Sequence, residues 1–228
     1  MILVESVERK IFDCPRKEGN NCPVAMKFKE NNKGNPKGDV PIPEAFLGNP
    51  QSRFMIIGIN PGASENYIKC KNFEEYQKWI REHLPSFWQY HYATEIFGNL
   101  PLKQGGGIVT NLVHCSTPSW RRQKEREWQL SELEKEKSLE LCSQFCIEMI
   151  ERVDPELILL HGLDTVRFFA DHCGWKDIDK NAENEAIHGL QKTCNNRTFV
   201  LSRHLRSMCF KKGHEKWIRL KNSVEVRK

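Results

Sequence analysis

Four short apolar segments recur along the chain, and each has the length of a buried β-strand. They cover residues 54–59, 108–113, 157–160 and 199–201. Because these segments are largely apolar instead of alternating with polar residues, they favour strands that are buried on both faces of a parallel sheet.

Segments with helical periodicity separate these strands. Apolar residues spaced by three and four positions predict helices over residues 73–84, 130–153 and 164–173, and Pro155 ends the second of them. The basic tail, residues 211–228, is predicted to be helical in part. Strands that alternate with helices predict a three-layer α/β/α fold around a central four-stranded parallel sheet, with right-handed crossovers.

The first fifth of the chain differs from the rest. Residues 14–50 are rich in Asn, Gly and Pro and show no periodicity, which predicts loops. We therefore expect a single domain in which an N-terminal arm, residues 1–52, packs on a core of residues 53–228.

Composition narrows the class of protein. The chain of 228 residues carries a formal net charge of +5 and has a pI near 8.7, which permits nucleic-acid binding without requiring it. It has no run of about 18 apolar residues that could cross a membrane. Residues 1–12 lack the apolar core of a signal peptide, so we expect a cytoplasmic protein with no membrane partner.

Nine cysteines are many for such a chain. In a reducing compartment disulfides are a poor explanation, and ligation of a metal or an iron–sulfur cluster is a better one. Buried free thiols are the alternative.

Three polar side chains fall at or near the ends of predicted strands: Asn60, Asn111 and His204. The first lies in the turn Gly-Ile-Asn-Pro-Gly, residues 58–62, whose Pro and Gly fix an unusual backbone path. If the strands are parallel, all three side chains approach the carboxyl edge of the sheet, where ligands bind in open α/β folds. Asn offers a donor and an acceptor to an amide-like base edge, and His can donate to a developing anion.

The motifs around these residues have counterparts in a known family. Residues 58–62, residues 110–118 (Thr-Asn-Leu-Val-His-Cys-Ser-Thr-Pro), residues 157–162 (Leu-Ile-Leu-Leu-His-Gly) and residues 202–207 (Ser-Arg-His-Leu-Arg-Ser) occur in the order of that family's motifs. Over residues 53–210 the chain resembles the uracil-DNA glycosylase superfamily. The first motif is similar to that of the mismatch-specific branch, and the second to that of the iron–sulfur branch.

The resemblance implies a role for each polar residue. Enzymes of this superfamily flip a damaged base out of the duplex and hydrolyse its glycosidic bond. Asn60 would position or activate the attacking water, Asn111 would bind the Watson–Crick edge of the base, and His204 would stabilise the negative charge on the departing base.

Further residues would complete the base pocket. Phe73 would stack on the base, and Tyr67 is the second candidate for this role. The alternative for Phe73 is that its ring packs in the core. Backbone groups of Ile59 and Gly62 would line the pocket. His161 and His188 are expected to be structural. The resemblance and the surrounding basic charge also predict a DNA-binding set: Arg203, Leu205, Arg206, Ser207, Met208, Lys211 and Lys212.

The same resemblance implies a [4Fe–4S] cluster, with zinc as the second choice. The four ligands that match by position are Cys14, Cys22, Cys115 and Cys142. The remaining five cysteines are expected to be free thiols: Cys70, Cys146, Cys173, Cys194 and Cys209. Cys146, one helical turn after Cys142, is the best substitute ligand.

The expected function is that of a monomeric, monofunctional DNA glycosylase in base excision repair, acting on deaminated bases and on uracil first. No lysine lies in the catalytic motifs, which disfavours a lyase that acts through a Schiff base. Two alternatives stay open. Leu205, which replaces the family's proline, and the unmatched residues 63–105 would suit a non-catalytic module that binds damaged DNA. The cysteines would also suit an iron–sulfur or zinc protein of RNA metabolism.

Overall fold

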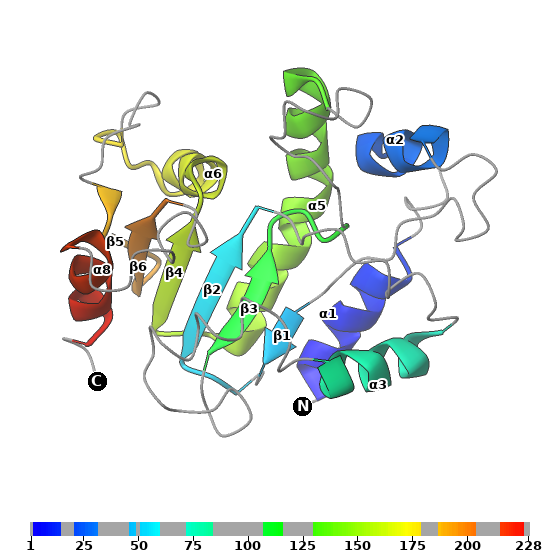
Figure 1. The fold of residues 1–228 in the computed structure, drawn as a ribbon, viewed down its shortest axis with the longest axis horizontal. Coiled ribbons are helices and arrows are strands. Elements are labelled where there is room, and N and C mark those ends of the chain that lie inside the picture. Colours follow the sequence, from blue (N-terminus) through cyan, green and yellow to red (C-terminus); the bar gives the residue numbers. More distant parts are fainter. Residues whose placement is uncertain are drawn as a thin grey trace. The chain divides into compact units, whose positions relative to one another are not determined.

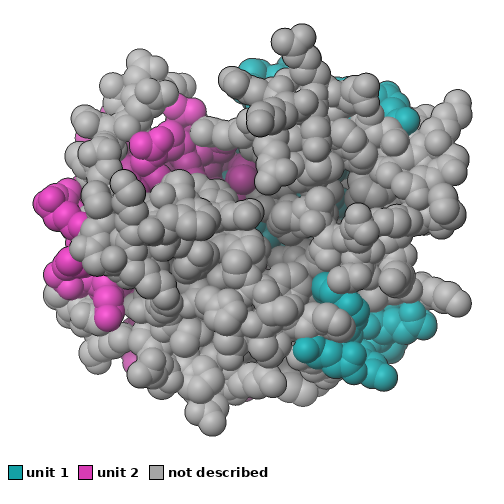
Figure 2. Space-filling view, viewed as in Figure 1, with its two compact units in different colours: residues 1–46, 60–83, 111–152 teal, residues 47–59, 84–110, 153–228 magenta. Residues whose placement is uncertain are grey.

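The structure is a computed structural model, and its chain divides into two compact units (Figure 2). Unit 1 contains residues 1–46, 60–83 and 111–152, and unit 2 contains residues 47–59, 84–110 and 153–228. The division into an arm of residues 1–52 and a core of residues 53–228 stays a prediction. The structure describes residues 2–14, 21–31, 46–48, 51–59, 72–83, 107–115, 130–178, 187–203 and 215–225.

The described strands form a six-stranded sheet with the order β1-β3-β2-β4-β6-β5 (Figure 1), all of it in unit 2 except Phe46 and Asn111, which belong to unit 1. The strands are β1 (Phe46–Gly48), β2 (Phe54–Gly58), β3 (Ile108–Asn111), β4 (Leu157–His161), β5 (Leu190–Cys194) and β6 (Arg197–Ser202). The four strands expected from their apolar segments are confirmed as β2, β3, β4 and β6. The expected strand number of four is wrong, because β1 and β5 extend the sheet at its two edges.

Parallel pairing holds the centre of the sheet together. β4 pairs in parallel with β2 on one side and with β6 on the other, so that Met55, Ile158 and Phe199 lie in one row across three strands. All five residues of β4 are buried, which explains why its sequence is apolar almost throughout.

Helices cover both faces of the sheet in unit 2. Phe199 of β6 lies against Phe169 of α6 (Leu163–Cys173) and against Trp175, at ring-centroid distances of 5.4 and 5.3 Å. Gln191 of β5 has the opposite parity in the β5–β6 register, and its side-chain amide donates to the backbone carbonyl of Ser223 in α8 (Glu215–Glu225). The expected α/β architecture is therefore confirmed, and α8 confirms the helix predicted in the basic tail.

β5 and β6 form a hairpin at the edge of the sheet. Asn195 and Asn196 connect them with φ angles of 48° and 62°, both in the left-handed region that a two-residue hairpin turn requires. Asn adopts this region more readily than most residues, which explains why two of them stand here.

A disulfide joins this hairpin to α6. Cys173, the last residue of α6, bonds to Cys194 at the end of β5, with their Cα atoms 5.8 Å apart. The expectation that these two cysteines are free thiols is therefore wrong. A reducing compartment disfavours disulfides in general, but it does not show which cysteines the fold brings together. The β5–β6 hairpin places this pair at bonding distance.

Unit 1 consists of four described helices: α1 (Ile2–Phe12), α2 (Pro23–Asn31), α3 (Phe73–His83) and α5 (Glu132–Val153). The predictions for residues 73–84 and 130–153 are confirmed. A reciprocal cap explains where α5 begins, because the Ser131 hydroxyl accepts from the Glu134 backbone amide and the Glu134 carboxylate accepts from the Ser131 amide. The prediction of loops alone over residues 14–50 is wrong, since α2 and β1 lie there.

α1 packs on both α3 and α5. Phe12 contacts Phe73 and Tyr76 of α3 at centroid distances of 5.6 and 5.3 Å. On the other side, Lys10 donates to Glu148 of α5 at 2.9 Å, and this bond together with that from Arg152 lowers the pKa of the Glu148 carboxyl. None of the described helices is long and apolar enough to cross a membrane.

The disulfide gives a stability prediction. Cys173 and Cys194 are 21 residues apart, and closing a loop of this length lowers the entropy of the unfolded chain enough to stabilise the fold by about 3 kcal/mol. Cys194→Ser should therefore lower the free energy of unfolding by about that amount, measured by denaturant titration.

A double variant, Cys173→Ser with Cys194→Ser, serves as the control, because a reductant should shift its unfolding midpoint little. If the wild-type midpoint is the same with and without a phosphine reductant, the stabilising role is refuted. Alkylation of the denatured, unreduced protein should leave Cys173 and Cys194 unlabelled and should label both after reduction.

Candidate active site

The carboxyl ends of the parallel strands lie at one edge of the sheet. The register pairs Ile57 with Leu160 and His161 with Ser202, so β2, β4 and β6 end almost level with one another. Figure 1 shows the arrowhead of β3 directed toward the same edge. In open α/β sheets, this edge is where ligands bind.

Asn111 is the last residue of β3 and lies at this edge. It is only 4% exposed, between Thr110 and Leu112, which are fully buried. Within the described structure its side-chain Nδ2 has no hydrogen-bond partner. An unpaired buried donor costs about 1–3 kcal/mol of stability. Native structures retain such groups mainly where a ligand or water completes the bonding.

Asn60 and His204, the other two predicted polar residues, lie outside the described residues. Their places along the chain are nevertheless bounded by described strands. Asn60 follows Gly58, the buried last residue of β2, by two positions, and His204 follows Ser202, the buried last residue of β6, also by two positions. Ile59, between Gly58 and Asn60, is half-buried, and Gly62 lies outside the described residues.

The exit from β6 is held by several hydrogen bonds. The Ser202 carbonyl accepts from the Gly162 backbone amide at 2.9 Å, and the Leu201 carbonyl accepts from the Gly189 amide at 2.9 Å. The Ser202 hydroxyl is fully buried, donates to the Arg203 carbonyl at 2.9 Å and lies 3.3 Å from His188 Nδ1. The motif that begins at Ser202 predicts no role for this serine itself, and His188 is predicted to be structural.

Phe73, the predicted stacking residue, lies in the interior of unit 1. It is 2% exposed, its ring meets those of Phe12 and Tyr76, and the Arg9 guanidinium covers it at 4.4 Å from the ring centroid. In this conformation the ring has no exposed face on which a base could stack. The burial favours the core-packing alternative. Tyr67, the reserve, lies outside the described residues.

The four predicted cluster ligands all belong to unit 1 and all are buried. Cys14 follows α1, Cys22 precedes α2, Cys115 follows β3 and Cys142 lies within α5. None of them is in a disulfide. Four buried thiols in one unit fit the chemistry of a cluster. Within the described residues, however, no three Cys, His, Asp or Glu side chains converge closely enough to hold a metal ion. We therefore derive no chemical step from a metal.

Cys146, the substitute ligand, lies one helical turn beyond Cys142. It is fully buried, and this burial raises the pKa of its thiol far above the usual value.

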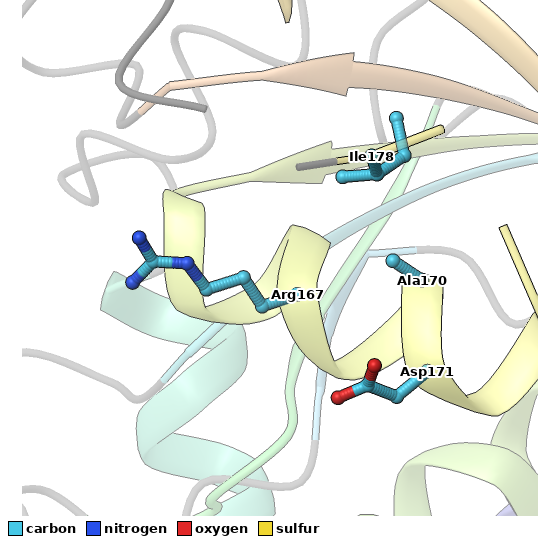
Figure 3. Close-up of a pocket in the computed structure, with 4 residues that line it drawn as sticks. All are labelled: Arg167, Ala170, Asp171 and Ile178. Carbon is cyan, nitrogen blue, oxygen red and sulfur yellow. The ribbon is translucent and has the colours of Figure 1, made fainter. Parts of the chain in front are cut away.

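A separate pocket of about 320 Å³ lies on the flank of α6 (Figure 3). Arg167, Ala170 and Asp171 line it from the helix, and Ile178 lines it from the segment that follows. Arg167 is already within ion-pair distance of Asp164, at 3.6 Å. Among the residues that the structure describes, no predicted site residue lines this pocket.

Of the predicted DNA-binding set, the structure describes Arg203 alone, and that residue is half-buried directly after β6. The others lie outside the described residues: Leu205, Arg206, Ser207, Met208, Lys211 and Lys212.

Comparison with known proteins agrees with this geometry. A family model described as the uracil DNA glycosylase superfamily matches residues 45–217, a range that contains all six strands and the positions of Asn60, Asn111 and His204. A search of curated proteins finds no significant match. The match covers well over half of the chain and coincides with an α/β fold whose parallel strands end at one edge. The chain belongs to the uracil DNA glycosylase superfamily.

Proposed function

We propose that this protein is a monofunctional DNA glycosylase that removes a deaminated base, with uracil as the first choice, at the start of base excision repair. The observation that carries the proposal is the buried amide nitrogen of Asn111, which has no partner within the described structure, at the carboxyl end of β3 in a chain of this superfamily.

The hydrogen-bonding pattern of an asparagine amide suits uracil. Asn111 offers a donor at Nδ2 and an acceptor at Oδ1. Uracil presents the complementary pair, the O4 acceptor and the N3–H donor. Cytosine carries an N4 amino group in place of O4, so it would set two donors against each other. A base of the uracil type would thus pair the amide nitrogen that the described structure leaves without a partner.

Base extrusion makes the amide reachable. Flipping a nucleotide out of the duplex costs a few kcal/mol, and less when the base is mismatched, so deaminated bases opposite guanine are selected at this step. Stacking on an aromatic side chain recovers about 1–3 kcal/mol per base. Because Phe73 is packed in unit 1, Tyr67 is the better candidate for that platform.

The reaction is a hydrolysis of the N-glycosidic bond. Water attacks C1′ of the sugar while the bond electrons leave with the base, and the products are the free base and an abasic site. Asn60 would orient the water. His204 would donate a hydrogen bond to the base oxygen on which negative charge collects, a contribution comparable with that of an oxyanion-hole donor.

DNA contacts would come from the segment that follows β6. Its basic residues suit phosphate groups, and Leu205 or Met208 suits the space left by the extruded base. We assign the contact set to Arg203, Leu205, Arg206, Ser207, Met208, Lys211 and Lys212.

We further propose that Cys14, Cys22, Cys115 and Cys142 hold a [4Fe–4S] cluster with a structural role. Their burial within one unit supports this proposal, and zinc is the alternative for the same ligands. Such a group would fasten the N-terminal segment to α5.

The central test is a panel of duplexes that each contain one uracil, hypoxanthine, xanthine or thymine opposite guanine, incubated with protein and then cleaved by alkali. Wild-type protein should release uracil. His204→Ala should lower kcat by about 10²–10³-fold, because the leaving base loses its donor. Tight binding to damaged duplexes with no product from any of the four would instead support a non-catalytic DNA-binding module.

Asn111→Leu separates binding from stability. The substitution conserves volume and removes an amide nitrogen that has no partner within the described structure, so the free energy of unfolding should change little. Excision of uracil should fall about 5- to 150-fold, which is the cost of one lost hydrogen bond of about 1–3 kcal/mol. Denaturant titration and single-turnover kinetics measure the two effects.

Ser131→Ala is the opposite control for that experiment. It removes the cap of α5 and should lower stability by about 1 kcal/mol while leaving excision unchanged. If Asn111→Leu reduces stability and leaves excision intact, Asn111 has no role in base recognition.

A matched cysteine pair tests the cluster. Cys142 and Cys146 are both buried and stand one turn apart on α5. Cys142→Ser should abolish bound iron and visible absorbance in anaerobically purified protein, whereas Cys146→Ser should retain both. If metal analysis of the wild-type protein finds one zinc per chain and no iron, zinc is the bound metal. If the two variants contain equal amounts of iron, Cys142 is not a ligand.

A further inference from the structure

Two buried polar residues meet at the end of β6, immediately before the proposed catalytic histidine. Ser202 is fully buried and His188 is 2% exposed. The mechanism above uses neither of them. The inference that follows rests on the proposed function, in which His204 stabilises the leaving base.

The two residues form a short hydrogen-bonded chain. The Ser202 hydroxyl donates to the Arg203 carbonyl at 2.9 Å, and His188 Nδ1 lies 3.3 Å from the same hydroxyl oxygen. A hydroxyl has a single proton, so an oxygen that donates to Arg203 accepts from His188. From this bonding we assign the proton of His188 to Nδ1.

The last acceptor of this chain belongs to the peptide group that enters His204. The Arg203 carbonyl and the His204 amide nitrogen share one planar unit, which also contains the Cα atoms of both residues. A hydrogen bond that fixes the Arg203 carbonyl oxygen therefore fixes the peptide plane through which the chain leaves Arg203.

His188 is itself held in place from the side of α8. The Ser223 hydroxyl lies 3.0 Å from the carbonyl oxygen of Gly189, the next residue, and 2.8 Å from that of Arg219 in its own helix, so its single proton is shared between the two acceptors. Gly189 has a φ of 81°, and a Cβ there would lie 2.5 Å from the Ser223 hydroxyl oxygen, so only glycine fits. The Gly189 amide also donates to the Leu201 carbonyl at 2.9 Å, which joins this turn to β6.

We propose that Ser202 and His188 are positioning residues for His204. They set the direction in which the chain leaves β6 and so the place from which the imidazole donates to the departing base. Electrostatic stabilisation of a leaving group depends on a donor that is fixed before the reaction, and a displacement of about 1 Å can cost 10²-fold in rate.

The test compares Ser202→Ala with Ser138→Ala on a uracil duplex under single-turnover and steady-state conditions. Ser138 is an equally buried serine whose hydroxyl donates to a backbone carbonyl, that of Glu134, and it lies on α5 in unit 1. Ser202→Ala should lower kcat on the order of 10- to 100-fold with an unchanged KM. Ser138→Ala should lower the melting temperature and leave kcat unchanged.

Two further measurements separate positioning from general destabilisation. Amide hydrogen exchange in a peptide beginning at Arg203 should be faster in Ser202→Ala than in wild type, and not in Ser138→Ala. At position 188, Asn carries its amide nitrogen as many bonds from Cα as His carries Nδ1, whereas the nitrogen of Gln is one bond further. His188→Asn should therefore retain most of the activity that His188→Gln loses.

The outcomes are distinct. If wild-type protein removes uracil and Ser202→Ala matches it in rate and in exchange, the positioning role is refuted while the proposed function stands. Equal loss in His188→Asn and His188→Gln would also refute the part assigned to His188. If wild-type protein removes no base of the panel, the proposed function fails, and the positioning role fails with it.

Discussion

The parallel pairing of β4 with β2 and β6 is the constraint on which the candidate site depends. It makes β4 a fully buried central strand and brings the carboxyl ends of three strands to one level. A parallel neighbour can be reached only by a crossover, so each strand end is followed by a turn at the same edge. Asn60 and His204 each stand two residues beyond such an end.

The sequence predicted this central part well because burial on both faces leaves one pattern. Residues 54–59 and 157–160 are apolar at nearly every position, and a short run of this kind is typical of a strand that is buried on both faces. The edge strands were missed for the opposite reason. β5 reads Leu-Gln-Lys-Thr-Cys and is mostly exposed, so hydrophobicity alone does not distinguish it from a loop. The pair Asn195-Asn196 was the available indication, since two residues with positive φ commonly close a hairpin.

The candidate site was predictable in its chemistry but only partly in its contacts. Asn111 could be selected because an amide follows an apolar strand, yet only the structure shows that its nitrogen is buried without a partner in the described residues. Phe73 could not be assigned from its spacing, because its burial arises from α1, 61 residues earlier at Phe12. The spacing of residues in a sequence identifies a candidate, whereas the packing of distant segments decides whether its surface is available.

The contact between His188 and Ser202 joins the first residue of the fourth motif to a residue that lies outside the motifs. They are 14 residues apart, and the β5–β6 hairpin turns that separation into adjacency. The disulfide at one end of β5 and the Ser223 contact at the other hold the hairpin against α6 and α8. An edge hairpin that supplies no catalytic group can therefore still control the geometry of the site, because it determines how firmly the chain is held where it leaves β6.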